Sequence, residues 1–131
     1  MTCRADSRAV DATLQLLHRV ADEVAARLRG VTDWGLSGLR ETQYVADVEA
    51  DEVAVSMLLE GGFGVLSEES GRSGAELDRV VVIDPLDGST NASHGIPWYA
   101  TAMCMVDDEG PAAALVVNQY SGQRLEATRG G

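Results

Sequence analysis

The amino-acid sequence predicts an α+β domain in which two helices pack on a mainly antiparallel sheet. Two long stretches with the apolar spacing of amphipathic helices fill the first part of the chain, and short apolar stretches bounded by turn-forming residues follow them. Helices that precede strands, instead of alternating with them, favour this class over a repeating βαβ fold. The 131 residues suit one domain, and 45% hydrophobic with 24% charged residues is typical of a globular protein.

The first helix is predicted from a stripe of apolar residues at steps of four and three, a period near that of an α-helix. The stripe consists of Val10, Leu14, Leu17, Ala21, Val24 and Leu28. Gly30 follows it as the expected end of the helix.

A second helix is predicted over about residues 46–60, with Val48, Val55 and Leu59 on its apolar side. Glycines at positions 61 and 62 end it. Asp47 and Asp51 are four residues apart and therefore share one face of this helix.

Strands are expected after the second helix, over residues 63–66, 80–83, 99–106 and 112–117, with 123–128 as a candidate for a fifth. Residues 70–74, between the first two strands, are polar and rich in glycine, so we expect a loop there.

Charge and hydropathy exclude several classes of protein. Ten basic and 21 acidic residues give a net charge of −11, so no basic surface is available for nucleic acid. We expect no membrane partner either, because no stretch of 18 apolar residues is present and the polar segment 1–8 is unlike a secretory signal. Cys3 and Cys104 lack the spacing of a metal or redox motif, so we expect free thiols and a cytoplasmic protein.

The strongest chemical signal is the run Ile83-Asp84-Pro85-Leu86-Asp87-Gly88-Ser89-Thr90-Asn91. An apolar strand delivers two aspartates at its end, proline stiffens the turn between them, and glycine allows a ligand to approach the backbone closely. The segment that follows can begin a helix, whose free N–H groups bind anions. Carboxylates beside such a cradle suit Mg²⁺, which prefers oxygen ligands and is often shared with a substrate phosphate. By spacing alone, a plain turn followed by a helix cap is an equally good interpretation.

Two further acidic pairs precede this run. Glu68 and Glu69 follow the first predicted strand, where adjacent residues point to opposite sides, so one can face a site while the other is solvated or structural. Asp47 and Asp51 lie on the preceding helix. Either pair alone is more often solvent-exposed surface. Their joint appearance, with eight acidic and no basic residues between positions 41 and 69, favours the metal-site hypothesis.

These motifs resemble those of the inositol monophosphatase family, the Mg²⁺-dependent, lithium-sensitive phosphomonoesterases. Residues 84–91 resemble the first signature of the family, residues 67–70 its upstream Glu-Glu-Ser element, and residues 93–97 the His-Gly-x-Pro run that follows the signature. Residues 118–131 resemble the hairpin behind it. The resemblance implies the N-terminal part of the layered αβαβα sugar-phosphatase fold, with residues 1–131 as a metal- and phosphate-binding domain whose C-terminal half is absent.

The resemblance also implies a set of ligands. Two or three Mg²⁺ ions, with Li⁺ as an inhibitor, would be held by oxygen atoms of Glu68, Asp84, the Leu86 backbone and Asp87. The substrate phosphate would be bound by Gly88, Ser89 and Thr90.

Asp47 and Ser89 would orient the attacking water. The family usually carries threonine three residues before this aspartate, where the present chain has Tyr44, so Glu49 stays an alternative to Asp47.

These roles imply Mg²⁺-dependent hydrolysis of a small phosphate monoester by a metal-activated water, with inositol monophosphate first among the small polyol and sugar phosphates. A homodimer is compatible with this expectation. Family chains are longer, and their C-terminal half carries a second signature, Trp-Asp-x-Ala, that completes the site. The alternative is therefore a catalytically incompetent half-protein or fragment that binds metal and needs the missing half.

Overall fold

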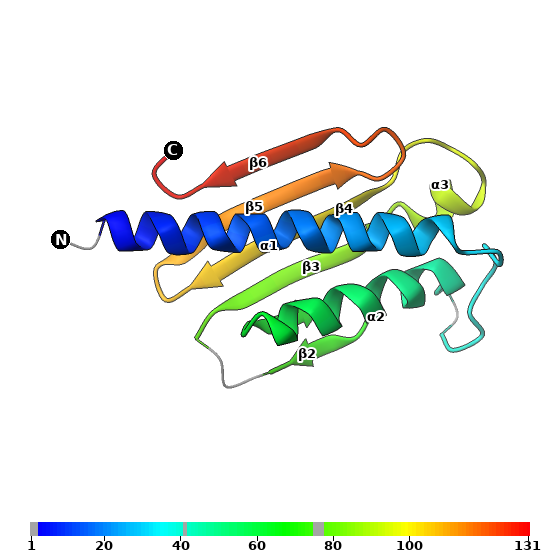
Figure 1. Ribbon diagram of the computed structural model, residues 1–131. Coiled ribbons are helices and arrows are strands. Elements are labelled where there is room, and N and C mark those ends of the chain that lie inside the picture. The colour runs from blue at the N-terminus through cyan, green and yellow to red at the C-terminus, as the bar shows by residue number, and fades with distance from the viewer. Residues whose placement is uncertain (1–2, 41, 75–77) are drawn as a thin grey trace.

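The computed structural model has two layers (Figure 1) and describes residues 3–40, 42–74 and 78–131, with only the backbone for residues 3–6. Helices α1 (Cys3–Arg29) and α2 (Val45–Glu60) lie side by side across one face of a six-stranded sheet. The α+β class and the packing of helices on a sheet are thereby confirmed. Cys104 is a free thiol. Residues 1–2 and the Cys3 side chain, which bear on the predicted N-terminal segment and the second thiol, lie outside the described part.

The remaining elements are β1 (Gly64–Ser67), β2 (Gly71–Ser73), β3 (Val80–Asp87), α3 (Ser89–Ser93), β4 (Ala100–Asp107), β5 (Gly110–Asn118) and β6 (Arg124–Thr128). The strand order is β2-β1-β3-β4-β5-β6, with β1 and β3 parallel and all other neighbours antiparallel. The sheet is therefore mainly antiparallel, as expected, and each of the five predicted strands starts within two residues of its expected position.

Strand β2 corrects the prediction that residues 70–74 form only a loop. Its three residues pair antiparallel with β1, and Arg72 stands opposite Leu66. No apolar alternation marks this segment. It becomes a strand because the outer edge of β1 would otherwise leave backbone N–H and C=O groups without partners.

Helix α1 buries the predicted apolar stripe. Leu17, Ala21, Val24 and Leu28 are buried, and the remaining members of the stripe pack partly buried against the same core. The helix lies over β4 and β5. Although α1 has 27 residues, none of the helices in the described ranges is long and apolar enough to cross a membrane.

Helix α2 corrects the predicted apolar side. Val48 and Val55 are only half-buried and Leu59 is exposed. The face turned to the sheet instead consists of Ala46, Asp47, Ala50, Asp51, Ala54 and Leu58. Alanine side chains are short, so this face lies close to the sheet and carries its two aspartates into the interior. A hydrophobicity pattern alone could not select a face built from small and acidic residues.

The second face of the sheet is apolar and uncovered by any helix of the described ranges. In the observed register, the apolar members of one row across it are Leu66, Val82, Cys104, Ala114 and Ala127, and Arg72 stands at the β2 end of this row. The apolar members of the next row are Ala102, Val116 and Leu125, and Asp84 stands at its β3 end. The four largest of the apolar side chains are 42–68% exposed. We refer to these eight apolar residues as the open face.

Candidate metal and phosphate site

Glu68 and Asp84 come together because β1 and β3 are parallel. Their register pairs Ser67 with Ile83, and the ladder continues one step further, where the Glu68 N–H donates to the Ile83 carbonyl oxygen at 3.0 Å. Parallel strands end at the same edge of a sheet. Two of the predicted metal ligands, distant in the sequence, are therefore neighbours.

The carboxyl group of Asp84 interacts with those of Glu68 and Asp87. Burial, followed by hydrogen bonding with Glu68 and the charges of Glu68 and Asp87, raises the pKa of Asp84 to about 7, against a smaller opposing effect of the Leu86 N–H. A proton between Glu68 and Asp84 relieves the repulsion at neutral pH. A divalent cation relieves the same repulsion by charge, since carboxylates held together favour positive charge between them.

The turn after β3 is built for glycine. Gly88 has φ 89° and ψ 32°, a left-handed conformation that other residues adopt only with strain. A Cβ atom at this position would stand 2.8 Å from the Trp98 carbonyl oxygen. Helix α3 begins directly afterwards, so the N–H groups of its first residues, Ser89 and Thr90, have no partner within the helix.

Asp47 is buried beside this turn. It is 2% exposed, and its Oδ2 accepts a hydrogen bond from the Tyr44 N–H at 2.9 Å. Oδ1 has no hydrogen-bond partner among the described residues. Burial is the main cause of the raised pKa of Asp47, whereas the Tyr44 N–H and the Ser89 hydroxyl favour its charged form. A buried carboxylate oxygen without a partner is costly and points to a missing ligand such as an ordered water.

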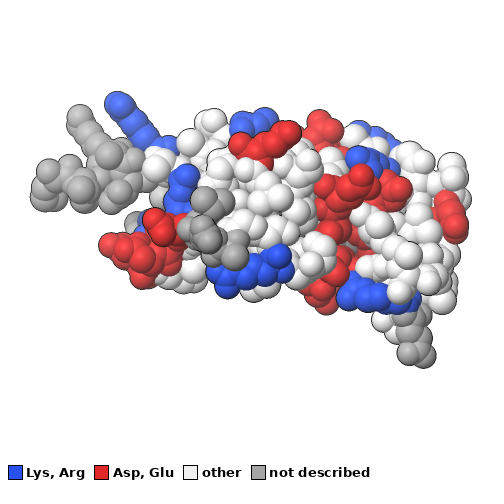
Figure 2. Space-filling model, turned by 90° about the horizontal axis from the view of Figure 1, so that it is seen from below, with Lys and Arg blue, Asp and Glu red and all other residues white. Residues whose placement is uncertain are grey.

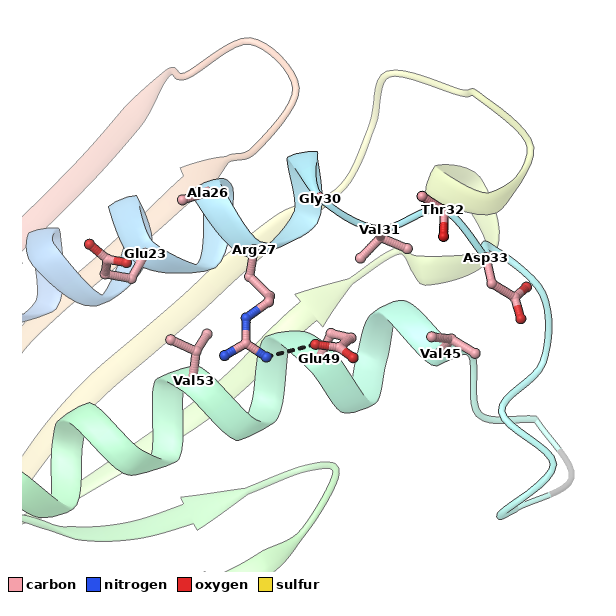
Figure 3. Close-up of a pocket in the computed structure, with 10 residues that line it drawn as sticks. All are labelled: Glu23, Ala26, Arg27, Gly30, Val31, Thr32, Asp33, Val45, Glu49 and Val53. Atoms are coloured by element: carbon pink, nitrogen blue, oxygen red, sulfur yellow. Dashed lines mark hydrogen bonds and ion pairs between the residues drawn. The ribbon is translucent and has the colours of Figure 1, made fainter.

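Glu49, the alternative to Asp47, lies elsewhere. Figure 3 shows it beside Arg27, in the pocket between α1 and α2. The pocket has a volume of about 460 Å³, and Glu49 accepts a 2.6 Å hydrogen bond from Arg27 there. Of the two acidic residues, Asp47 is the one that lies next to Ser89.

Sequence reasoning missed two hydroxyl groups that hold the strand ends. The Ser67 hydroxyl donates to the buried carboxylate of Asp51, so Asp51 supports the site and does not enter it. The Thr101 hydroxyl donates to the Pro85 carbonyl oxygen at 2.8 Å, beside the irregular register between Asp84 and Asp87. The only sequence signals are a serine directly before the glutamate pair and a threonine within an apolar strand.

A second pocket, of about 500 Å³, opens beside the glycine turn and onto the open face. Its ten lining residues are Asp87, Gly88, Asn91, Trp98, Tyr99, Ala100, Val116, Asn118, Gln123 and Leu125. The space next to the predicted site is thus bounded on one side by apolar sheet residues that no described helix covers.

The predicted donors fit a hard cation chemically, but they are not preassembled around one. Glu68, Asp84, Asp87 and the Leu86 carbonyl offer oxygen atoms only, which suits Mg²⁺. Within the described ranges, no group of three or more Asp, Glu, His or Cys side chains is spaced to hold a metal ion. The pair of Glu68 and Asp84 is in place, and the third carboxylate acts on Asp84 by charge. Figure 2 shows the largest group of acidic side chains right of centre, toward the end of the molecule where α2 begins, and a smaller group near the opposite end.

Carboxylates at the end of a strand, beside a glycine turn and free backbone N–H groups, are donors that suit a cation and an anion side by side. The chain belongs to the inositol monophosphatase family, whose model matches residues 4–131. The resemblance drawn from the motifs is thereby confirmed.

Individual relatives agree with this assignment. The chain is 36% identical over 115 residues to the chloroplastic phosphatase IMPL1 of Arabidopsis thaliana. This match covers 84% of the chain and 30% of the relative. It is 33% identical over 90 residues to a fructose-1,6-bisphosphatase of Pyrococcus furiosus, and this match covers 69% of the chain and 35% of the relative. The crystal structure of the extragenic suppressor protein SuhB from Bartonella henselae matches 92% of the chain and 50% of its own, with a TM-score of 0.78 and 27% identity.

The chain spans about a third of the length of the first curated relatives that it matches, and half of the SuhB structure. The relatives therefore contain a further region of comparable size or larger that has no counterpart in these 131 residues.

Proposed function

We propose that the chain carries the metal- and phosphate-binding half of a Mg²⁺-dependent phosphomonoesterase. The observation that carries this proposal is the buried Asp47 carboxylate, whose Oδ1 lacks a partner and which lies next to Ser89 at the glycine turn. A structural aspartate would satisfy both oxygens, whereas one that orients a water keeps an oxygen for it. Membership of the inositol monophosphatase family supports the same activity.

In the proposed site, Glu68, Asp84, the Leu86 carbonyl and Asp87 would hold Mg²⁺, and a bound Mg²⁺ would supply a water of lowered pKa and offset the charge of the substrate phosphate. Asp47 Oδ1 would accept a hydrogen bond from the attacking water, and the Ser89 hydroxyl, which lies next to Asp47, would help to orient that water. Backbone N–H groups of residues 88–90 bind the phosphate oxygens. The chain itself thereby orients the water and the phosphate, without a covalent phosphoenzyme.

The proposed substrate is a small phosphorylated polyol or sugar, with inositol monophosphate first. Relatives named fructose-1,6-bisphosphatase and fructose-1,6-bisphosphatase/inositol-1-monophosphatase support this class, at 33% and 34% identity. None of the proposed site residues distinguishes one polyol or sugar phosphate from another.

A second candidate function is favoured by the open face. In this alternative the chain binds metal but turns over no substrate until the region present in its relatives packs on that face. No helix of the described residues covers the eight apolar side chains of the open face, and the pocket beside Asp87 is lined by two of them, Val116 and Leu125. The further half of the SuhB structure is of a size to provide both. A second copy of the chain is the competing occupant.

Phosphate release from inositol 1-phosphate tests the proposal, with the purified chain at millimolar Mg²⁺ and with the metal chelated. Asp87→Asn is the site variant, and Asp22→Asn on the surface of α1 is the control for loss of one carboxylate. Mg²⁺-dependent release that Li⁺ inhibits, lost in Asp87→Asn but not in the control, supports an active chain. Mg²⁺ binding by calorimetry without release supports the half-protein instead, and absence of both contradicts the proposal. Sedimentation equilibrium distinguishes a monomer from a homodimer.

A further inference from the structure

The turn that carries Glu68 is clamped from outside by the segment that precedes α2. Arg40 Nη2 donates to the backbone carbonyl oxygen of Glu69 and to its Oε2, both at 2.8 Å. Gln43 Nε2 donates to the same Oε2, also at 2.8 Å. The Glu69 side chain is only 16% exposed. Glu69 is therefore held by its neighbours, whereas the adjacent Glu68 is exposed and directed to Asp84.

The same turn is fixed from inside. The Glu69 N–H donates to the Ser67 hydroxyl at 3.1 Å, and that hydroxyl donates to the buried Asp51. The Glu68 N–H continues the ladder to Ile83. Inner contacts hold the backbone on the β1 side of the turn, and on its outer side Arg40 binds both the main chain and the side chain of one residue.

We propose that Arg40 is a positioning residue that acts through Glu69 to hold Glu68 in the orientation that receives a divalent cation. The inference rests on the proposed role of Glu68 as a metal ligand. Contacts behind a metal ligand orient it, and their loss weakens metal binding by one to two orders of magnitude. Arg40 is 55% exposed, which places its effect at the lower end.

The test compares Arg40→Gln with Arg27→Gln. Arg27 forms an ion pair of similar length, 2.6 Å to Glu49, and its side chain is 39% exposed, in the pocket between α1 and α2. Both variants lose one positive charge. Among the described residues, Arg40→Gln loses the ion pair with Glu69, whereas Arg27→Gln loses the pair with Glu49 and a longer one with Glu52, at 3.7 Å, so only the first variant loses the clamp. Titration calorimetry of the metal-free chain with MgCl₂ measures affinity, and amide hydrogen exchange at Glu69 measures order in the turn.

We expect Arg40→Gln to weaken Mg²⁺ binding about tenfold and to speed exchange of the Glu69 amide. Arg27→Gln should leave both unchanged, and Arg40→Lys, which keeps a donor and the charge, should recover most of the affinity. Equal affinities in Arg40→Gln and Arg27→Gln overturn the inference. So does weaker binding with unchanged exchange at Glu69, because Arg40 then acts by charge alone. If the parent chain binds no Mg²⁺, the proposed function is wrong. The role of Arg40 in ordering the turn is tested separately, because it is wrong if the Glu69 amide exchanges at the same rate in Arg40→Gln as in the parent chain.

Discussion

The Tyr44 hydroxyl donates to Thr90 Oγ1 at 3.2 Å and so joins the start of α2 to α3. The two elements carry Asp47 and Ser89, which must face the same water in the proposed reaction. Tyrosine reaches across this distance, whereas the threonine usual in the family has a much shorter side chain.

Tyr44→Phe removes this bond and keeps the ring. Because both groups are exposed, we expect the free energy of unfolding to fall by no more than about 1 kcal/mol. Amide exchange at Ala92, whose N–H donates to the Gly88 carbonyl oxygen at 3.0 Å in α3, should nevertheless become faster. Tyr120→Phe, at a 65% exposed tyrosine after β5, is the matched control in urea unfolding and exchange measurements. Equal exchange at Ala92 in the two variants would show that the contact does not order α3.

Gly88→Ala should destabilise the chain strongly, because the added Cβ meets the Trp98 carbonyl oxygen and the residue has a positive φ. The left-handed conformation alone costs about 1–2 kcal/mol, and the close contact adds to it. Gly122→Ala isolates the conformational part, since Gly122 has φ 80° and no atom within 4 Å of its Cβ position. Urea unfolding of both variants measures the difference, and equal losses would contradict a steric role for the Trp98 carbonyl.

The stability of the metal-free chain should depend on pH through Asp84. The pKa of this group is about 7 in the folded chain against 3.8 for a free aspartate, so the folded state binds more protons between these values. The free energy of unfolding contributed by Asp84 is therefore fully present below about pH 4 and is lost as the pH rises through 7.

Urea unfolding at pH 5 and pH 8, with metal chelated, measures this dependence. Asp84→Asn should flatten it relative to the parent chain, and added Mg²⁺ should restore stability at pH 8 in the parent only. A slope that is the same in the parent and in Asp84→Asn would assign the dependence to other groups.

The open face should make the isolated chain prone to association. Val82→Thr with Val116→Thr keeps β-branched residues in the strands but lowers the apolarity of the face. We expect less fluorescence from a hydrophobic dye and a smaller particle by light scattering, with little change in the urea midpoint. Leu39→Thr, at a 74% exposed leucine in the loop before α2, is the control. If Leu39→Thr lowers dye binding as much as the double variant does, the open face is not the surface through which the chain associates.

Elements with a long or regular apolar pattern were predictable from the sequence. Helix α1 contains the whole predicted stripe, and the strands β4 and β5 lie within two residues of their expected bounds, because their side chains repeat at the period of the element. Strand β3 starts where expected but continues to Asp87, so the turn expected between Asp84 and Asp87 is instead an irregular end of this strand. The strand β2 and the buried face of α2 were not predictable. The first depends on the free edge of β1, and the second on alanines that allow close packing against a sheet.

For the candidate site, the sequence by itself determined the chemistry: the Asp84–Asn91 run, the glutamate pair and Asp47, which together indicate the family. Residue type and short spacing suffice for this, because they set which atoms can ligate a cation or an anion. Only the tertiary structure decided which carboxylates share the site. The parallel pairing of β1 with β3 places Glu68 against Asp84, and the orientation of α2 directs Asp47 to Ser89 and Glu49 to Arg27. Such choices depend on contacts between distant segments, which local spacing does not contain.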